Sequence, residues 1–380
     1  MRKLHRGERS CMLPDGSDRV SSTPKQQLFD ALRLRLGDYL QVEELSSDLE
    51  LSGGLTRGLL DELSADGAEL EHHPGLGYRL GGIADQLLQA EIHYELETQT
   101  LGRDLVVRER VESTNDVAGE LVEAGAGEGT LVVADVQSAG RGRRGRAWFS
   151  PPGAGLWCSL VLAAPPDGLD PGFLTLLLGG AIARAIRLHC GLRVRLKWPN
   201  DLVASRRVEV AGLSGLSGDS GCREEGAANP AVVERKLGGI LCELHSAGRD
   251  RQPVLIAGFG IDVNLTAFPV ELAATATSIL LETGERTNRC LLLKEVLREI
   301  ERDYLCAAAG GGNLILQQTL KLSSTLGRRV LVRTEAGQLV GVAEEIRPDG
   351  SLVLADDGGE RHTVRTGDLV NLQEGDCVAS

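Results

Sequence analysis

Apolar residues with helical spacing begin a little after the start of the chain. From Lys25 leucines recur in three short segments, which the polar and glycine-rich stretches at 37–38 and 52–54 separate. A turn at 74–75 then joins two short segments at 68–73 and 77–80. Three helices followed by a hairpin are typical of a winged helix-turn-helix, here predicted over residues 24–81. Residues 1–23 lack periodicity and predict a disordered tail.

The middle of the chain alternates apolar strands with helices. Residues 82–320 therefore predict one mixed α/β domain, joined to the first by a connecting helix over 85–96. A stretch rich in Gly, Ser and Ala predicts an exposed hairpin insertion at about 206–232. Strands are expected at 104–111, 130–136, 156–162, 193–197, 236–244 and 254–259, and helices at 117–122, 173–189 and within 269–310.

The last part of the chain changes pattern again. Short apolar strands separated by Gly or Asp turns predict a small β-barrel of the SH3 type over residues 321–375. These strands are expected at 329–333, 339–346, 351–355 and 362–365. The whole chain therefore predicts an α+β protein with three domains.

Composition narrows the classes of function. The 380 residues carry a formal net charge of −13, which argues against general binding to nucleic acid or to an anionic membrane. The eight cysteines are scattered without C-x-x-C spacing, as expected of reduced thiols in a cytoplasm. No apolar run predicts a membrane span, and the first twenty residues lack a signal-peptide core. We therefore expect a cytoplasmic protein that is not in a membrane.

One basic loop stands out in this acidic chain. Residues 137–148 contain four arginines, three glycines and Trp148. Glycine lets a backbone approach a ligand closely, while guanidinium groups bind carboxylate or phosphate through paired hydrogen bonds. The stretch predicts a loop, with no helix or strand of its own, that closes over an anionic ligand. A solvated basic loop and a nucleic-acid patch are the alternatives.

Further polar clusters lie where predicted strands meet turns or helices. Ser113-Thr114-Asn115 precedes a helix, and Lys197-Trp198-Pro199-Asn200-Asp201 follows a strand. A helix cap and a strand-end turn are their structural explanations. Lys236-Leu237-Gly238-Gly239-Ile240 and Gly258-Phe259-Gly260-Ile261-Asp262 are strands in which glycines permit close approach.

In this order the loop and the clusters resemble the biotin–protein ligases, specifically the bacterial bifunctional type. The resemblance covers roughly residues 25–372 and implies a winged helix, a central ligase domain like the class II synthetases, and an SH3-like domain. It implies that biotin and ATP, with Mg²⁺, form biotinyl-5′-AMP and pyrophosphate. The acyl group then passes to one lysine of a biotin carboxyl carrier protein. A homodimer and a biotin-responsive repressor are further expectations.

The resemblance also implies the site residues. The catalytic group is Lys236, Arg143 and Asp201, of which Asp201 is the expected Mg²⁺ ligand or the acceptor of the lysine proton. Biotin is expected to contact Ser113, Thr114, Asn115, Gln137, Gly140, Arg141, Gly142, Arg143 and Lys236. ATP is expected to contact Arg141, Arg143, Arg144, Arg146, Trp148, Lys197, Asn200 and Asp262.

Two departures from the family bear directly on function. Asp262 stands where the family usually has Asn, close to the expected adenine site. The segment 24–80 holds five Lys/Arg against eleven Asp/Glu, a difference of −6, whereas a DNA reader needs several cations for phosphate. The predicted winged-helix fold thus favours operator binding, whereas the negative charge of this segment opposes it. Lipoate or octanoate ligases of the same fold, and a non-catalytic repressor that senses biotinyl-adenylate, remain alternative functions.

Overall fold

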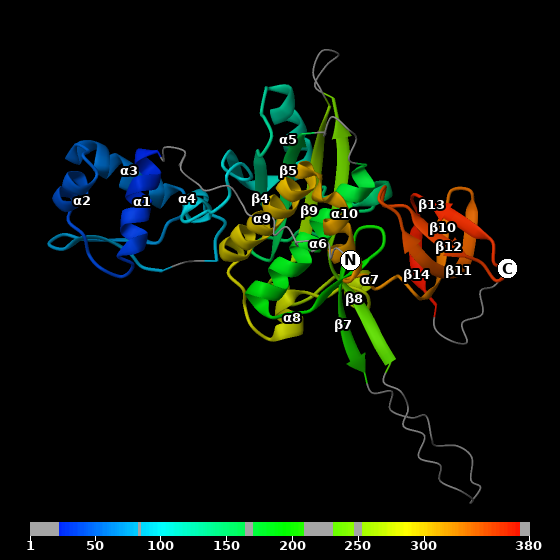
Figure 1. Ribbon diagram of the computed structural model, residues 1–380. Helices are drawn as coiled ribbons and strands as arrows, with labels where there is room; N and C mark the ends of the chain where they lie inside the picture. Colours follow the sequence, from blue (N-terminus) through cyan, green and yellow to red (C-terminus); the bar gives the residue numbers. More distant parts are fainter. Residues whose placement is uncertain (1–22, 83–84, 164–169, 209–230, 247–252, 373–380) are drawn as a thin grey trace, which may run out of the picture.

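The computed structural model describes residues 23–82, 85–163, 170–208, 231–246 and 253–372 (Figure 1). Most of the predicted tail and most of the predicted insertion lie outside these residues. Three parts follow one another along the chain. A group of short helices lies on the left of Figure 1, a large sheet with helices lies in the middle, and a smaller sheet lies on the right.

The first part contains the three helices and the hairpin that the sequence predicts. Side-chain hydroxyl groups cap the N-termini of two of the helices. Thr23 Oγ1 accepts from the N–H of Gln26, and Ser52 Oγ accepts from the N–H of Leu55. Apolar side chains from all three helices form their own buried core. Residues 24–80, called the N-terminal unit below, comprise α1 (Pro24–Leu34), α2 (Val42–Asp48), α3 (Gly53–Ala65), β1 (Leu70–His73) and β2 (Gly77–Leu80).

The connecting helix is shorter than predicted. Within the predicted range 85–96 only α4 (Gln89–His93) is helical. The backbone carbonyls of residues before it accept hydrogen bonds from side chains of α9 (Arg289–Cys306). The carbonyl of Asp85 accepts from Arg289 Nη2 at 2.8 Å, and that of Gln86 accepts from Cys290 Sγ at 3.1 Å. These bonds replace the hydrogen bonds of a helical turn, so tertiary contacts override the local apolar pattern.

The middle part is built on a seven-stranded sheet in the order β3-β4-β5-β9-β8-β7-β6. β3 and β4 are parallel, and every other neighbouring pair is antiparallel. All six expected strands are present, and the structure adds β7, which the sequence did not predict. The strands are β3 (Leu105–Val111), β4 (Leu131–Gln137), β5 (Gly155–Ala163), β6 (Val194–Lys197), β7 (Asp201–Val208), β8 (Ala231–His245) and β9 (Val254–Asp262).

Helices cover both faces of this sheet, as the alternation of side chains along a strand requires. On one face, Val132, Val161 and Ile256 pack against α5 (Thr114–Glu123). On the other face, neighbouring residues such as Val133 and Leu160 join the main core with α6 (Pro171–Cys190) and α9. The large core therefore lies on the face that α6 and α9 cover, and part of the face that α5 covers remains for a site.

Helix α6 is long and apolar enough to cross a membrane by length and composition, which differs from the expectation that no such run exists. However, 67% of its most apolar window is buried inside the protein. Its leucines and alanines pack on the sheet and on α9. The helix is therefore accounted for as a core helix, and the cytoplasmic location stays a prediction.

The last part is a five-stranded antiparallel sheet in the order β13-β12-β11-β10-β14. The sequence predicts four of its strands but misses the edge strand β14, which spans only four residues. The sequence also misses α10 (Gly312–Leu320), which follows a run of glycines. The strands are β10 (Arg329–Thr334), β11 (Gly337–Ile346), β12 (Leu352–Ala355), β13 (Arg361–Val364) and β14 (Asp368–Asn371).

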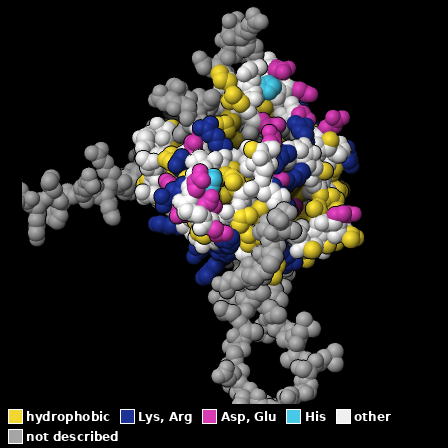
Figure 2. Space-filling model, turned by 90° about the vertical axis from the view of Figure 1, so that its right-hand side faces the viewer, with side chains coloured by type: hydrophobic (Ala, Val, Ile, Leu, Met, Phe, Trp, Pro, Cys, Tyr) yellow, Lys and Arg dark blue, Asp and Glu magenta, His cyan; other side chains and the backbone are white. Residues whose placement is uncertain are grey.

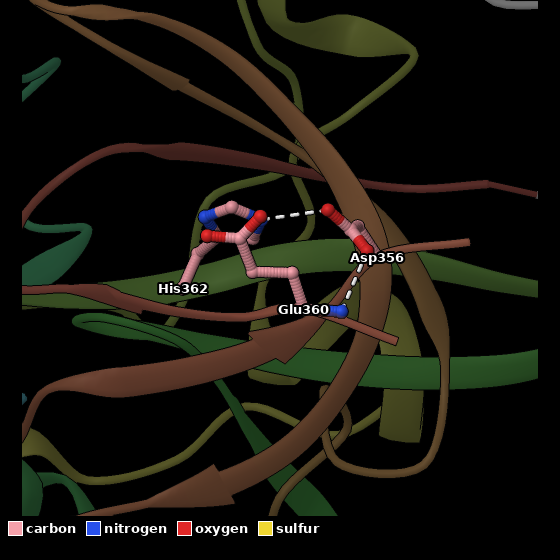
Figure 3. Close-up of side chains that lie close together, drawn as sticks. All are labelled: Asp356, Glu360 and His362. Carbon is pink, nitrogen blue, oxygen red and sulfur yellow. Dashed lines mark hydrogen bonds and ion pairs between the residues drawn. The ribbon is translucent and has the colours of Figure 1, made fainter. Parts of the chain in front are cut away.

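A polar cluster closes the turn between β12 and β13 (Figure 3). Asp356 Oδ1 accepts from the backbone N–H of Gly358 and of Glu360, both at 2.9 Å, while Oδ2 lies 2.8 Å from His362 Nε2. The hydrogen bond to His362 is the main reason that the pKa of Asp356 lies below its usual value. In return, that bond raises the pKa of His362. These contacts explain the cluster as a turn-stabilising element.

Candidate active site

The predicted polar group at the start of α5 forms one end of a pocket. Thr114 donates from its backbone N–H and from its hydroxyl to Gln137 Oε1, at 2.9 and 3.2 Å. Ser113 occupies the N-cap position, but its side chain makes no capping bond. Its buried hydroxyl lines the pocket. The group therefore leaves the Ser113 hydroxyl in the pocket beside the oriented amide of Gln137 and does not use it to cap the helix.

Asn115 lines the pocket but its amide is held by the protein. Its Nδ2 donates to Glu243 at 2.6 Å, and its Oδ1 accepts from Ser159 at 2.5 Å. A Cβ on Gly258 would lie 2.3 Å from Asn115 Oδ1, so this residue must be glycine for the asparagine to fit. The contacts make Asn115 part of the wall.

The basic loop has more local structure than predicted. Arg143–Gly145 form a single 3₁₀ turn, and Arg141 makes an isolated β-bridge with Ala147. Gly140 lies outside the pocket lining, where a Cβ would come within 2.9 Å of Gln137 Nε2. Its role is to let the loop pass close to Gln137.

Carboxylates hold three of the four loop arginines. Both Nη atoms of Arg141 donate to Asp116 at 2.5 Å. Arg144 and Arg146 both pair with Asp368 at the start of β14, at 3.2 Å for Arg144 Nη1. Arg144 points to this carboxylate and does not line the pocket, whereas Arg141 and Arg146 do. The C-terminal sheet thus helps to hold the loop, a contact that the sequence did not reveal because β14 was missed.

Arg143 differs from the other three. It hydrogen bonds to Thr366, and its Nη1 lies 3.5 Å from Asn200 Oδ1, but no carboxylate among the described residues pairs with it. Burial is the main reason that the pKa of Arg143 falls below its usual value. A guanidinium remains charged at neutral pH even so. The pocket therefore contains a partly desolvated cation that an anion can neutralise.

Lys236 lies in the same pocket, on β8. Its Nζ is 2.6 Å from Asp201 Oδ1 and 5.1 Å from the centre of the Trp148 ring. Lys197 also lines the pocket. Asn200 lines it too, with Nδ2 donating to the carbonyl of Ile240 at 2.8 Å. The predicted lysines and the Asn-Asp pair are thus brought together.

Glycines form the floor beneath Trp148. A Cβ on Gly260 would lie 2.5 Å from Trp148 Nε1, and one on Gly239 would lie 3.5 Å from the ring. These two residues face each other across β8 and β9. The indole therefore lies flat on a stretch of sheet that has no side chains, as the close-approach glycines predicted.

The pocket combines most of the predicted residues with several unpredicted ones. The predicted lining residues are Ser113, Thr114, Asn115, Gln137, Arg141, Gly142, Arg143, Arg146, Trp148, Lys197, Asn200, Asp201, Lys236 and Asp262. The others include Cys158, Phe268, Leu272, Thr275, Gly367, Asp368 and Leu369. The face of the molecule that carries the C-terminal sheet shows basic side chains interspersed with acidic and apolar ones (Figure 2).

Known proteins are similar to this chain over the same regions. Residues 107–262 match the Biotin/lipoate A/B protein ligase family, and residues 325–370 match the Biotin protein ligase C terminal domain. The Bifunctional ligase/repressor BirA of Bacillus subtilis is 30% identical over 342 residues, which cover 90% of this chain and 96% of that protein.

Two further relatives are similar over somewhat shorter stretches. The Biotin--[acetyl-CoA-carboxylase] ligase of Mycobacterium tuberculosis is 30% identical over 281 residues, which cover 71% of this chain and 90% of that protein. Among solved structures, the biotin protein ligase from Aquifex aeolicus in complex with biotin and ATP has a TM-score of 0.56 and 26% identity. It covers 70% of this chain and 98% of its own.

Proposed function

The chain belongs to the biotin protein ligase family, and we propose that Arg143 and Lys236 bring the biotin carboxylate and the ATP phosphate together in its pocket. As a biotin ligase it forms biotinyl-5′-AMP and transfers biotin to a protein lysine. The observation that carries the assignment is the half-buried guanidinium of Arg143, which has no carboxylate partner among the described residues but lines the pocket together with Lys236.

The first step needs little acid–base chemistry. The carboxylate of biotin is ionised at neutral pH, so no strong base is required. The carboxylate and the α-phosphate repel each other, and two cations fixed between them lower that repulsion as the new bond forms. Lys236 is paired with Asp201 and would exchange that partner for the substrate oxygens. Trp148 and the arginine loop would keep water away from the mixed anhydride.

The polar end of the pocket suits the ureido ring of biotin, which presents one carbonyl oxygen and two N–H groups. The hydroxyl of Ser113 can donate or accept, and Gln137 Nε2 retains a second N–H beyond the one given to Ser150 at 3.0 Å. Thr114 fixes the amide of Gln137 in this orientation. Asn115 supports the wall through Glu243.

Mg²⁺ fits this pocket as a companion of ATP. In proteins Mg²⁺ commonly takes one or two carboxylates together with substrate phosphates, and Asp201 is a lining carboxylate whose present partner is a lysine. The metal would neutralise phosphate charge in the adenylation step. Asp201 could then accept the proton of the incoming lysine.

Pyrophosphate release tests the assignment of the acid substrate. The protein with ATP and Mg²⁺ should release pyrophosphate with biotin and not with lipoate or octanoate. Labelled biotin should then pass to an acceptor domain of a biotin-dependent carboxylase. Turnover with lipoate or octanoate would move the chain to the sister ligases, and no turnover with any acid would favour an adenylate sensor.

The other parts of the protein have proposed roles. The boundaries 24–81, 82–320 and 321–375 would define a winged helix, the ligase domain and an SH3-like domain that contributes Asp368 to the loop. The carrier protein would approach the pocket opening. The edge strand β3 has one neighbour and could pair with a second copy in a homodimer.

A repressor role is the second candidate, because similar proteins are named ligase/repressors. The charges of the N-terminal unit weigh against it. All five of its basic side chains already pair with carboxylates, so phosphate would have to displace these partners. The pairs are Lys25 with Glu62 and Asp66, Arg33 with Glu91, Arg35 with Glu44 and Asp48, Arg57 with Glu43, and Arg79 with Glu71.

A further inference from the structure

Asp262 is a buried acid without a partner. It is the last residue of β9, it lines the pocket, and only 4% of its surface is exposed. No described residue makes a hydrogen bond or an ion pair to its side-chain oxygens. Because a buried polar group without a partner is unfavourable, its presence points to a ligand that satisfies it.

The surroundings of Asp262 favour the uncharged form of its carboxyl group. Its cross-strand neighbour on β5 is Gly155, so no side chain faces it from that strand. Lys236 is the cation that acts on it, but this ammonium group pairs with Asp201 instead. Burial therefore raises the pKa of Asp262 well above its usual value, and Lys236 lowers it by less.

The register of the sheet places Asp262 at the end of β9 that is farther from α5 than Gly258. Gly258, Gly260 and Asp262 lie on the same face of β9, at intervals of two residues. Gly258 contacts Asn115 at the start of α5, and Gly260 lies under Trp148. If the ring of biotin occupies the α5 end and its carboxylate reaches Lys236, then the base of ATP lies beyond Trp148, towards Asp262.

We propose that Asp262 selects adenine by presenting a neutral carboxyl group, with one O–H donor and one C=O acceptor, to the base. This proposal rests on the proposed ligase function of the same pocket. Adenine offers the complementary pattern, an exocyclic N–H donor next to a ring-nitrogen acceptor, which Asn and Gln side chains recognise in the same way. A protonated Asp can therefore take the place of an asparagine.

Ionisation would reverse the preference. A carboxylate only accepts hydrogen bonds, so it no longer satisfies the ring-nitrogen acceptor of adenine. It matches two adjacent N–H donors instead, as on the N1 and N2 edge of guanine. The preference for ATP over GTP should therefore decline as the pH rises through the pKa of Asp262.

The test compares wild type, Asp262→Asn and Asp262→Ala in biotin-dependent pyrophosphate release between pH 6 and 9.5, with ATP or GTP. Above the pKa of Asp262, the wild-type KM for ATP should rise by about tenfold per pH unit. Asp262→Asn should abolish this rise while restoring the preference for ATP that Asp262→Ala loses, by about 5- to 100-fold. The exposed variant Asp357→Asn, on the C-terminal sheet, should follow the wild-type profile.

Several outcomes would overturn the proposal. The first is the same pH profile in wild type and Asp262→Asn, and the second is an unchanged ATP preference in Asp262→Ala. Calorimetric binding of biotin alone shows whether each variant is folded and keeps the other end of the pocket. If wild type releases no pyrophosphate with biotin, the proposed function itself fails. If it turns over ATP and GTP equally at every pH, only the role of Asp262 fails.

Discussion

The N-terminal unit and the pocket differ in how their charged side chains are paired. In the N-terminal unit every Lys and Arg pairs with a carboxylate, and most of these side chains are partly exposed, so the pairs add little stability each. In the pocket, the half-buried Arg143 and the buried Asp262 have no oppositely charged partner among the described residues. Burial in this form is unfavourable for folding.

The difference indicates where this protein binds its ligands. A surface whose cations are already neutralised gains little from an added anion, because an existing ion pair must first break. A pocket that keeps a desolvated cation and an unpartnered acid gains from a ligand that supplies the missing charge and hydrogen bonds. The largest effect of charge pairing on stability is expected at a buried cluster outside both regions.

Arg289 is a buried arginine whose charge is fully paired. Only 2% of its surface is exposed, and it links Asp85, just after the N-terminal unit, to Asp135 on β4 at 2.7 Å. Arg289→Met should lower the free energy of unfolding by about 3–5 kcal/mol, because it leaves two carboxylates without their cation. Denaturant unfolding measures this.

The matched control for Arg289 is Arg302→Met on the same helix. Arg302 is 44% exposed in its side chain and pairs with Glu299 and Asp303, which also bind Arg184. The loss should stay below about 1 kcal/mol. Equal losses in the two variants would show that burial does not distinguish these pairs.

Arg143→Ala tests the unpaired cation of the pocket. The kcat/KM for biotin-dependent pyrophosphate release should fall by about 10²-fold or more, corresponding to about 3 kcal/mol of lost transition-state stabilisation. Lys236→Ala should have an effect of the same size. Arg57→Ala in α3 removes a paired, exposed arginine and should leave the rate unchanged. Full activity in Arg143→Ala would remove this residue from the site.

Local patterns predicted most of the fold. Periods of two and of 3.6 residues located six of the seven strands of the central sheet and the long helices α6 and α9, since these elements bury regular apolar faces. They did not locate β7, which pairs with β6 and β8, α10, which follows glycines, or β14, whose four residues are held by pairing with β10. The helix predicted over residues 85–88 is absent because contacts with Arg289 and Cys290 replace it. The sequence did not reveal these contacts, since both partners lie far along the chain.

The candidate site was predictable to the extent that its chemistry is local. The arginine–glycine loop, Lys236 and the residues at the start of α5 stand out by composition, and fourteen of the sixteen predicted positions line one pocket. What the sequence could not show is which charges pair. Asp116 and Asp368 hold the loop arginines, and Asp201 holds Lys236, only because distant strands and helices meet.

The N-terminal unit provides a weaker effect to measure. With its five cations paired, the wild-type protein should bind double-stranded DNA without a steep dependence on salt. A double variant Asp61→Lys and Glu62→Lys places two new cations on α3 and should gain salt-sensitive binding, detected by fluorescence anisotropy. Steep salt-sensitive binding by the wild type would show that phosphate displaces the existing partners, and the contrast with the pocket would fail.

The smallest expected effect concerns the partly exposed Asp356–His362 pair (Figure 3). The pKa of His362 is raised mainly by its hydrogen bond to Asp356. Since the folded pKa exceeds the unfolded one, this pair stabilises the fold below the unfolded pKa of about 6.5, and the contribution is lost as the pH rises through the folded value. NMR titration should show a raised pKa for His362 that returns towards its usual value in Asp356→Asn. An unshifted pKa of His362 in the wild type would show that solvent screens this partly exposed pair, so that charge pairing has a measurable effect only at more deeply buried groups.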